Sequence, residues 1–203
     1  MSDRQQSRLL DPNWSYVGKA TLDEFGAAEW QILKAQRAPY MAEQHANQVL
    51  RLLAASKDDP TFGYQVNNFR HCIQSATMAL ADGRPEDYVV AALLHDIGFI
   101  ACTPTHGAFS ARLLAPFVGD DLVWMLERHQ YFQAIHFHDH PDVDRFAREK
   151  WRGHPHFAMT AEFVAKYDQN TIDPGIRELP IEAFEPMVKH VFARPPRAIP
   201  LPD

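Results

Sequence analysis

Residues 89–98 read Val-Val-Ala-Ala-Leu-Leu-His-Asp-Ile-Gly, and this stretch decides how the chain must fold. The run from Val89 to Leu94 is apolar on every side, so a helix formed by it should be buried on all faces. The run ends on His95 and Asp96. Burying an imidazole and a carboxylate is costly unless a salt bridge, a hydrogen-bond network or a metal ion compensates them. The rest of the chain must therefore supply the compensating groups.

Helical patterns lie on both sides of this stretch. Thr21 to Glu24 fits a capping box, which predicts a long helix that runs to about Ser56 and is interrupted or kinked near Pro39. Gly98 allows the chain to turn out of the buried helix. The apolar spacing predicts further helices over 66–81, from about 103 to 114, from about 120 to 132, from about 160 to 168 and around 187–192. No repeat and no strand-like alternation is found, so the predicted fold class is all-α.

Length and composition limit the classes of protein to which the chain can belong. With 203 residues, of which 46% are hydrophobic, we expect a single domain over residues 1–203 with a Pro-rich tail at 195–203. The net charge of −6 and the absence of a basic stripe argue against nucleic acid as a partner. No apolar run reaches the roughly 18 residues of a membrane span, and the N-terminus lacks a signal-peptide core. Cys72 and Cys102 show no metal-motif spacing, so we expect reduced thiols in a cytoplasmic protein.

Five separated helices each contribute one conspicuous polar group or pair. His129 and Asp168 lie on faces that otherwise look buried, whereas His71 lies roughly opposite the apolar stripe of its helix, on a face that is either exposed to solvent or lines an interior polar site. Taken singly, each group is more often structural than a ligand. Together, four imidazoles and two carboxylates would fill most of the coordination of two octahedral metals, and Asp96 could place one oxygen on each. Nitrogen and carboxylate ligands without thiolates suit iron or manganese, and can also hold zinc. The predicted metal ligands are His71, His95, Asp96, His106, His129 and Asp168.

The order of these residues resembles the HD-domain superfamily, which holds metals in a helical bundle through the pattern H…HD…D. The extra histidines His106 and His129 resemble its binuclear branch. The step of 24 residues from His71 to His95, and the sequence Lys166-Tyr167-Asp168, resemble the diiron oxygenases of that branch, namely the phosphonate-cleaving oxygenases and myo-inositol oxygenase. The resemblance covers about residues 64–170, which would form the HD-domain core, and leaves residues 1–63 as an N-terminal helical extension.

The resemblance implies a mixed-valent diiron site (Fe²⁺/Fe³⁺) that uses O₂ to oxidise a small hydroxylated substrate and then to cleave a C–C or C–P bond. The alternative is a binuclear metal-dependent phosphohydrolase of the same superfamily, with Mn²⁺ or another divalent metal, that acts on a nucleotide or phosphoester. A third hypothesis is a non-catalytic HD module that binds a ligand or partner. The sequence does not choose between them outright, but the matching contexts of the two extra histidines favour the oxygenase.

The substrate pocket departs from that of the phosphonate-cleaving enzymes. Gln133 stands where they place a lysine, Ala165 where they place an arginine, and Phe99 where they carry a histidine. These losses of charged or polar groups argue for a less charged substrate than a phosphonate, and they weaken a phosphate hydrolase as well. Gln133 can still hydrogen-bond a hydroxyl or amide. Tyr64 resembles a lid tyrosine of that oxygenase branch, although its offset from His71 differs. The predicted catalytic residues are therefore Asp96, Gln133 and Tyr64.

Several residues near the ligands have roles that the sequence leaves open. Arg70 and Arg128 each precede a ligand and so point about 100° away from it on a helix, which favours salt bridges over catalysis. A Pro- and Asp-rich loop carries an H-x-H-x-H run that reads either as a lid or as a solvated surface. The histidines without an assigned role are His136, His138, His140, His154 and His156. The substrate and the oligomeric state stay unassigned.

Overall fold

A computed structural model describes residues 13–198, and within this range the secondary structure consists of helices and turns without a strand. The prediction of an all-α fold is therefore confirmed. In chain order the helices are α1 (Ala27–Ala55), α2 (Asn68–Ala81), α3 (Glu86–Leu94), α4 (His106–Leu114), α5 (Asp120–Gln133), α6 (Phe157–Phe163) and α7 (Glu185–Ala193). No helix among the described residues combines the length and the apolar character that crossing a membrane requires.

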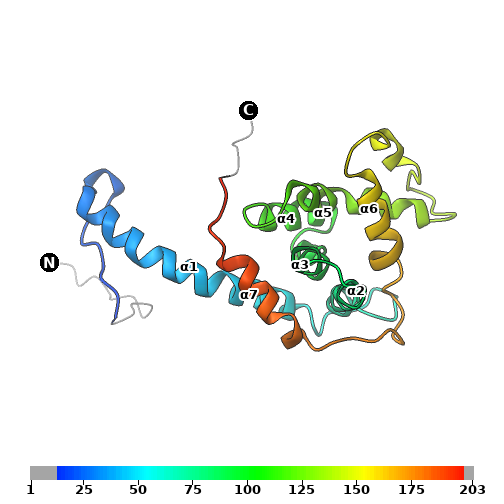
Figure 1. The fold of residues 1–203 in the computed structure, drawn as a ribbon, viewed down its shortest axis with the longest axis horizontal. Helices are drawn as coiled ribbons and strands as arrows, with labels where there is room; N and C mark the ends of the chain where they lie inside the picture. The colour runs from blue at the N-terminus through cyan, green and yellow to red at the C-terminus, as the bar shows by residue number, and fades with distance from the viewer. Residues whose placement is uncertain (1–12, 199–203) are drawn as a thin grey trace.

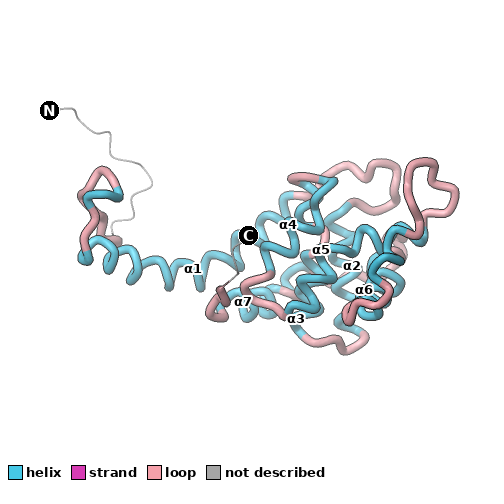
Figure 2. Tube along the Cα trace, turned by 90° about the horizontal axis from the view of Figure 1, so that it is seen from above, coloured by secondary structure: helices cyan, strands magenta, loops and turns pink. Residues whose placement is uncertain are grey.

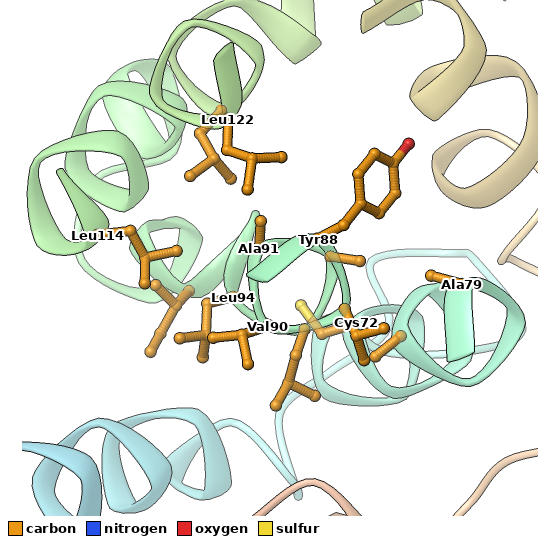
Figure 3. Packing of buried hydrophobic residues seen from close by; sticks show 14 of the residues in the cluster. Cys72, Ala79, Tyr88, Val90, Ala91, Leu94, Leu114 and Leu122 are labelled. Atoms are coloured by element: carbon orange, nitrogen blue, oxygen red, sulfur yellow. The ribbon is translucent and has the colours of Figure 1, made fainter. Parts of the chain in front are cut away.

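The helix α3 forms the centre of the bundle, as the apolar run predicts. Every side chain from Tyr88 to Leu94 is buried, and the other helices surround it (Figure 1). Figure 3 shows how this core is filled: Ala91 and Leu94 of α3 lie among side chains from α2, α4 and α5, which include Cys72, Leu114 and Leu122. Burial of such a run is worth roughly 1.5–3 kcal/mol for each large aliphatic side chain. The hydrophobic core therefore fixes the position of His95 and Asp96 at the end of α3.

The first helix begins later than the capping box at Thr21 predicts. Residues 22–24 form only a short 3₁₀ turn, and the side chain of Thr21 makes no capping hydrogen bond. The true cap is Gly26, whose backbone N–H donates to Glu29 Oε2 over 2.8 Å. The prediction was wrong because two stretches, Thr21 to Glu24 and Gly26 to Glu29, place a glutamate three residues after a possible cap, and the helix begins at the second.

The two halves of α1 have different surroundings. Its buried residues, Ala46, Val49, Leu50 and Leu53, all lie in the C-terminal half, where α7 runs beside it. The N-terminal half extends away from the bundle, and the helix is continuous through Pro39 (Figures 1 and 2). We call residues 13–40 the arm. The helix is therefore not interrupted at Pro39, and the alternative of a kink there stays a prediction.

Two glycines bring α4 close to its neighbours. A Cβ atom added at Gly98 would lie 2.7 Å from the carbonyl oxygen of His106, and one at Gly107 would lie 2.7 Å from the carbonyl oxygen of Leu126. Neither glycine has a positive φ, so the turn after α3 does not use a left-handed conformation at Gly98. Both residues instead permit contact between backbones, because any side chain would force the segments apart.

The last ligand-bearing segment departs from a regular α-helix. After α6, residues Val164–Asp168 form a π-helical turn, and π-helical turns occur often at functional sites. Tyr167 anchors the turn from outside, because its hydroxyl donates to Asp82 Oδ2 over 2.8 Å and accepts from Arg84 Nε over 2.9 Å. The turn thereby directs Asp168 into the bundle, where it is fully buried.

Candidate metal centre

The six predicted ligands come from five helical segments and meet at one end of the bundle. His71 lies in the first turn of α2, His95 and Asp96 follow α3, and His106 is the first residue of α4. His129 lies in the second half of α5, and Asp168 ends the π-helical turn. The structure thus brings together all six residues, which are separated by up to 97 positions in the sequence (168 minus 71).

All four imidazole rings have the same orientation. Each Nδ1 faces a carbonyl oxygen, and a carbonyl oxygen can only accept a hydrogen bond, so each Nδ1 must carry the proton. The neutral ring then presents the Nε2 lone pair to the interior, which is the arrangement typical of metal-binding histidines. The Nδ1 distances are 3.0 Å from His71 to Thr171 O, 2.8 Å from His95 to Ala92 O, 2.6 Å from His106 to Thr103 O and 2.8 Å from His129 to Leu126 O.

The Nε2 atoms meet in two pairs. His71 and His95 form one pair at 3.0 Å, and His106 and His129 form the other at 3.1 Å. Two lone pairs that face each other at this distance repel, so each pair needs a proton or a cation to offset the repulsion. The donor set therefore fits two cations, one at each pair of rings.

Asp96 lies between the two pairs. Its Oδ1 is 3.1 Å from His106 Nε2 and 3.0 Å from His129 Nε2, while its Oδ2 is 3.6 Å from His71 Nε2 and 3.7 Å from His95 Nε2. One carboxylate oxygen thus faces each pair of rings, as a carboxylate that bridges two cations would require.

The second carboxylate serves one pair only. Asp168 Oδ1 lies 3.5 Å from His71 Nε2 and 3.8 Å from His95 Nε2. Its other oxygen, Oδ2, is buried and has no hydrogen-bond partner in the described structure. An unpaired buried carboxylate oxygen is expensive, so a bound cation would offset a cost that the protein otherwise bears. We call His71, His95 and Asp168 the inner half of the cluster, and His106 with His129 the outer half.

Electrostatics at the cluster favour positive charge. Burial alone would raise the pKa of Asp96, but nearby His95, His106 and His129 hold it well below its usual range. Burial has the opposite effect on a histidine and would lower the pKa of His71. Hydrogen bonding to Asp168 and the charge of Asp96 outweigh burial and raise this pKa to about 9. For His95 burial dominates, and the pKa falls to about 4. Burial also acts to raise the pKa of Asp168, but the hydrogen bond to His71 and the nearby His95 and His129 lower it. Both carboxylates are therefore ionised, and protons and metal cations would compete for the same nitrogen atoms.

The inner half has hydrogen-bonding support that the sequence reading missed. Thr171 is fully buried, and its Oγ1 lies 2.9 Å from His71 Nδ1 in addition to the contact through its carbonyl oxygen. Ser75 Oγ lies 3.3 Å from Thr171 Oγ1, which extends the network by one residue. A signal was present, because Ser75 follows His71 by one helical turn and Thr171 follows Asp168 by three residues. Without the fold, however, nothing links Thr171 to His71.

Gln133 and Tyr64, the two predicted substrate contacts, lie in different environments. Gln133 Nε2 donates to Asp168 Oδ1 over 2.8 Å, so this residue contacts the cluster directly. Tyr64 lies on the connector before α2 with 60% of its surface exposed, and its side chain makes no hydrogen bond to the cluster in the described structure. The structure therefore places Gln133 at the site and leaves Tyr64 outside it.

The arginines that precede ligands form ion pairs, as predicted. Arg70 pairs with Glu178 at 2.7 Å and Arg128 with Glu127 at 2.7 Å. Arg128 also lies over the rings of Trp124 and Trp151, at 5.0 and 5.6 Å from their centroids. These contacts stabilise the outer surface of the bundle and do not direct charge at the cluster.

The histidines without an assigned role divide into three groups. His154 stacks on Trp124 with ring centroids 4.2 Å apart, and His156 lies beside it at 5.2 Å, so both belong to an aromatic surface cluster. His138 and His140 are exposed. His136 ends the turn that follows α5, and its Nε2 is buried without a hydrogen-bond partner in the described structure.

Comparison with known proteins gives limited support for an enzyme. Over 53 residues the chain is 43% identical to the [1-hydroxy-2-(trimethylamino)ethyl]phosphonate dioxygenase (glycine-betaine-forming) of Leisingera caerulea. The match covers 26% of this chain and 26% of that protein, so the chain spans about a quarter of the length of this curated relative. No family model matches the chain. The similarity is consistent with an oxygenase-like enzyme and does not identify a substrate.

Proposed function

We propose that this protein is a non-haem diiron oxygenase that binds two iron ions at the cluster and uses O₂ to oxidise a small hydroxylated substrate. The observation that carries the proposal is the arrangement of four Nε2 atoms in two pairs, at 3.0 and 3.1 Å, around the two oxygens of Asp96. Residues 64–170, which hold the whole cluster, would form an HD-domain core.

The two halves would offer different numbers of ligands to the irons. The inner half supplies His71, His95 and Asp168, and Asp96 Oδ2 adds a fourth donor. The outer half supplies two histidines, and Asp96 Oδ1 is its third donor. An octahedral ion at the outer half therefore keeps more positions open, and 13% of the Asp96 side chain is exposed beside it. We infer that the substrate hydroxyl binds at the outer half.

When bound, the irons would supply the reduction of O₂ and the oxidation of the substrate carbon. The chain's own residues position the reactants. Asp96 would hold the two ions at a fixed separation, and the carbonyl contacts of each Nδ1 keep the rings from rotating. Gln133 holds Asp168 Oδ1 through a neutral amide, and its carbonyl group would then be free to accept from a substrate hydroxyl or amide.

Charge near the cluster argues for a substrate other than a phosphonate. Gln133 is the side chain that contacts Asp168 from α5, and it is neutral. Ala165, one turn before Asp168, also lacks charge. The phosphonate in the name of the Leisingera protein is therefore not carried over to this chain. A dianionic group would have to be matched by cationic side chains, ideally arginine in bidentate geometry.

The test combines metal analysis with oxygen consumption. Protein purified aerobically should contain close to two irons per chain and show the electron paramagnetic resonance signal of a mixed-valent pair. Addition of a substrate from a panel of small hydroxylated compounds should then cause O₂ uptake. A protein that holds two irons and never consumes O₂ with any member of the panel would contradict the proposal.

The hydrolase alternative is tested in parallel. Protein loaded with Mn²⁺ should be inactive against a panel of nucleotides and phosphoesters, because no cationic side chain contacts the cluster among the described residues. Turnover of any phosphoester at a rate that falls when His129 is replaced by alanine would favour hydrolysis over oxygenation.

A further inference from the structure

The arm exposes large apolar side chains that the bundle does not cover. Trp30 is 51% exposed, Leu33 39% and Tyr40 40%, and all three lie on the half of α1 that extends away from the bundle (Figures 1 and 2). Phe25 packs against Trp30 with ring centroids 5.2 Å apart but leaves half of the indole open. Trp14 packs edge-on against Tyr40 with ring centroids 5.7 Å apart but is itself 39% exposed, so aromatic surface stays open along the arm, and contiguous apolar surface of this kind marks interaction sites.

A groove lies at the base of the arm. It has a volume of about 440 Å³ and runs between the C-terminal half of α1, the end of α4 and α7. Its lining is largely apolar and includes Met41, Leu52, Leu113, Phe117 and Phe192. Arg112 also lines the groove. The molecule therefore carries an exposed apolar projection and an open apolar groove on the same helix.

The helical part of the arm, residues 27–40, cannot fill the groove of its own chain. α1 is continuous from Ala27 to Ala55, and a helix does not fold back on itself. Trp30 and Gln48, which lines the groove, are 18 residues apart, so at 1.5 Å per residue they are about 27 Å apart along the axis. Within residues 13–198 no segment covers both surfaces, so both are open to a partner molecule.

A second copy of the chain matches both surfaces at once. If two α1 helices pair antiparallel about Tyr40, each residue lies opposite the residue whose number brings the sum to 80. Glu29 then faces the partner's Arg51, and Arg37 faces the partner's Glu43. Opposite charges thus meet at two kinds of position, and the two-fold axis repeats each of them. The contact is isologous, because the arm of each copy reaches the groove of the other and the symmetry closes.

The exposed apolar area of the arm is too small for a stable dimer unless the groove also belongs to the interface. At the exposed fractions above, the three arm side chains leave on the order of 250 Å² open. A stable interface buries roughly 800 Å² on each partner, so contact between the arms alone would not suffice. An arm seated in the partner's groove would add the groove-lining side chains to the interface.

We propose that the protein is a two-fold homodimer in which the α1 helices pair antiparallel and each arm covers the groove of the other copy. The arm then explains why a helix with exposed tryptophan and leucine extends beyond its own bundle. The inference does not depend on the metal centre, which lies within one chain.

The experiment measures the molar mass of the intact protein by light scattering after gel filtration, across a tenfold range of concentration. Wild-type protein should have twice the mass of one chain. Trp30→Glu should give a monomer, because a carboxylate would be buried in the partner's apolar groove, while its helical circular dichroism stays unchanged. The matched control is Phe146→Glu, at another exposed aromatic residue, 62% exposed and outside both surfaces, which should remain dimeric.

Cross-linking tests the antiparallel register. In a Cys102→Ser background, Tyr40→Cys lies on the proposed two-fold axis and should form an interchain disulfide on mild oxidation. Leu22→Cys, which is 67% exposed near the tip of the arm, should not. A wild-type monomer at all concentrations would overturn the proposal. So would a dimer that survives Trp30→Glu, or efficient cross-linking at Leu22→Cys with none at Tyr40→Cys.

Discussion

The inner and outer halves of the cluster offer similar histidine pairs, yet different forces hold them. In both halves each Nδ1 donates to a backbone carbonyl, but the inner half has two further side-chain hydrogen bonds, from His71 Nδ1 to Thr171 Oγ1 and from Gln133 Nε2 to Asp168 Oδ1. The outer half depends on the close approach of backbones, because Gly107 lets α4 lie directly against α5. A hydrogen-bonded half should tolerate small changes of distance, whereas a half defined by steric contact should fail when a single methyl group is added.

Asp96 is the one residue that both halves share, so its replacement should have the largest effect. Among the described residues Asp96 is the only carboxylate that faces both ring pairs, so we expect Asp96→Ala to lose both metal ions together. His129→Ala is the control that breaks one half, and it should mainly weaken the outer ion. Metal content by mass spectrometry after gel filtration distinguishes the two. Retention of one full equivalent by Asp96→Ala would show that the ion positions are independent.

Gly107→Ala should disturb the outer half of the cluster and leave the inner half in place. The added Cβ would lie 2.7 Å from Leu126 O and 3.4 Å from His129 Cε1, so α4 must move away from α5. Overpacking of this kind costs roughly 1–3 kcal/mol. We expect a lower free energy of unfolding in urea and loss of the outer ion before the inner one. Equal loss of both ions would contradict a separate steric origin for the outer half.

Thr171→Val breaks the hydrogen-bonded support of the inner half while its shape is kept. His71 would lose the Oγ1 contact but keep the carbonyl contact through Nδ1, so its ring should be held less firmly. Loss of such support to a ligand typically costs 10–100-fold in metal affinity. Competition with a chelator measures the effect, and Thr171→Ser is the conservative variant that should restore wild-type affinity.

Gln133→Leu should have a smaller effect on metal binding than on substrate binding. Asp168 Oδ1 loses one hydrogen bond to an ionised carboxylate, which is worth roughly 1.5–3 kcal/mol, but both histidines of the inner half remain. If Gln133 also contacts the substrate, the KM for an active compound should rise by about tenfold or more while metal content stays near that of the wild type. An unchanged KM would remove Gln133 from the substrate site.

Tyr64→Phe should have the smallest effect of the series. Its side chain is 60% exposed and is not hydrogen-bonded to either half in the described structure. Metal content and stability should match wild type within error. A large fall in turnover without a change in metal content would show that the connector closes over the site during the reaction.

The local sequence pattern determined which segments are helical and which polar residues are candidate metal ligands. The apolar run from Val89 to Leu94 forces a buried helix, because no face of it is polar. His129 and Asp168 could be named because each stands on a helix face that is otherwise apolar, whereas His71 lies opposite the apolar stripe of its own helix. The first inference rests on periodicity, which is a property of neighbouring residues, and the ligand set rests also on the order of its members, which resembles that of the HD-domain superfamily.

Only the tertiary structure decided how these residues meet. Thr171 contacts His71 across 100 positions of sequence, and Gln133 contacts Asp168 across 35. The close approach at Gly98 and Gly107, and the direction of the arm, likewise depend on how helices cross. Periodicity sets the face that a helix buries but not the partner that covers it. Distances between segments follow from side-chain volumes and backbone contacts, which a pattern along the chain does not contain.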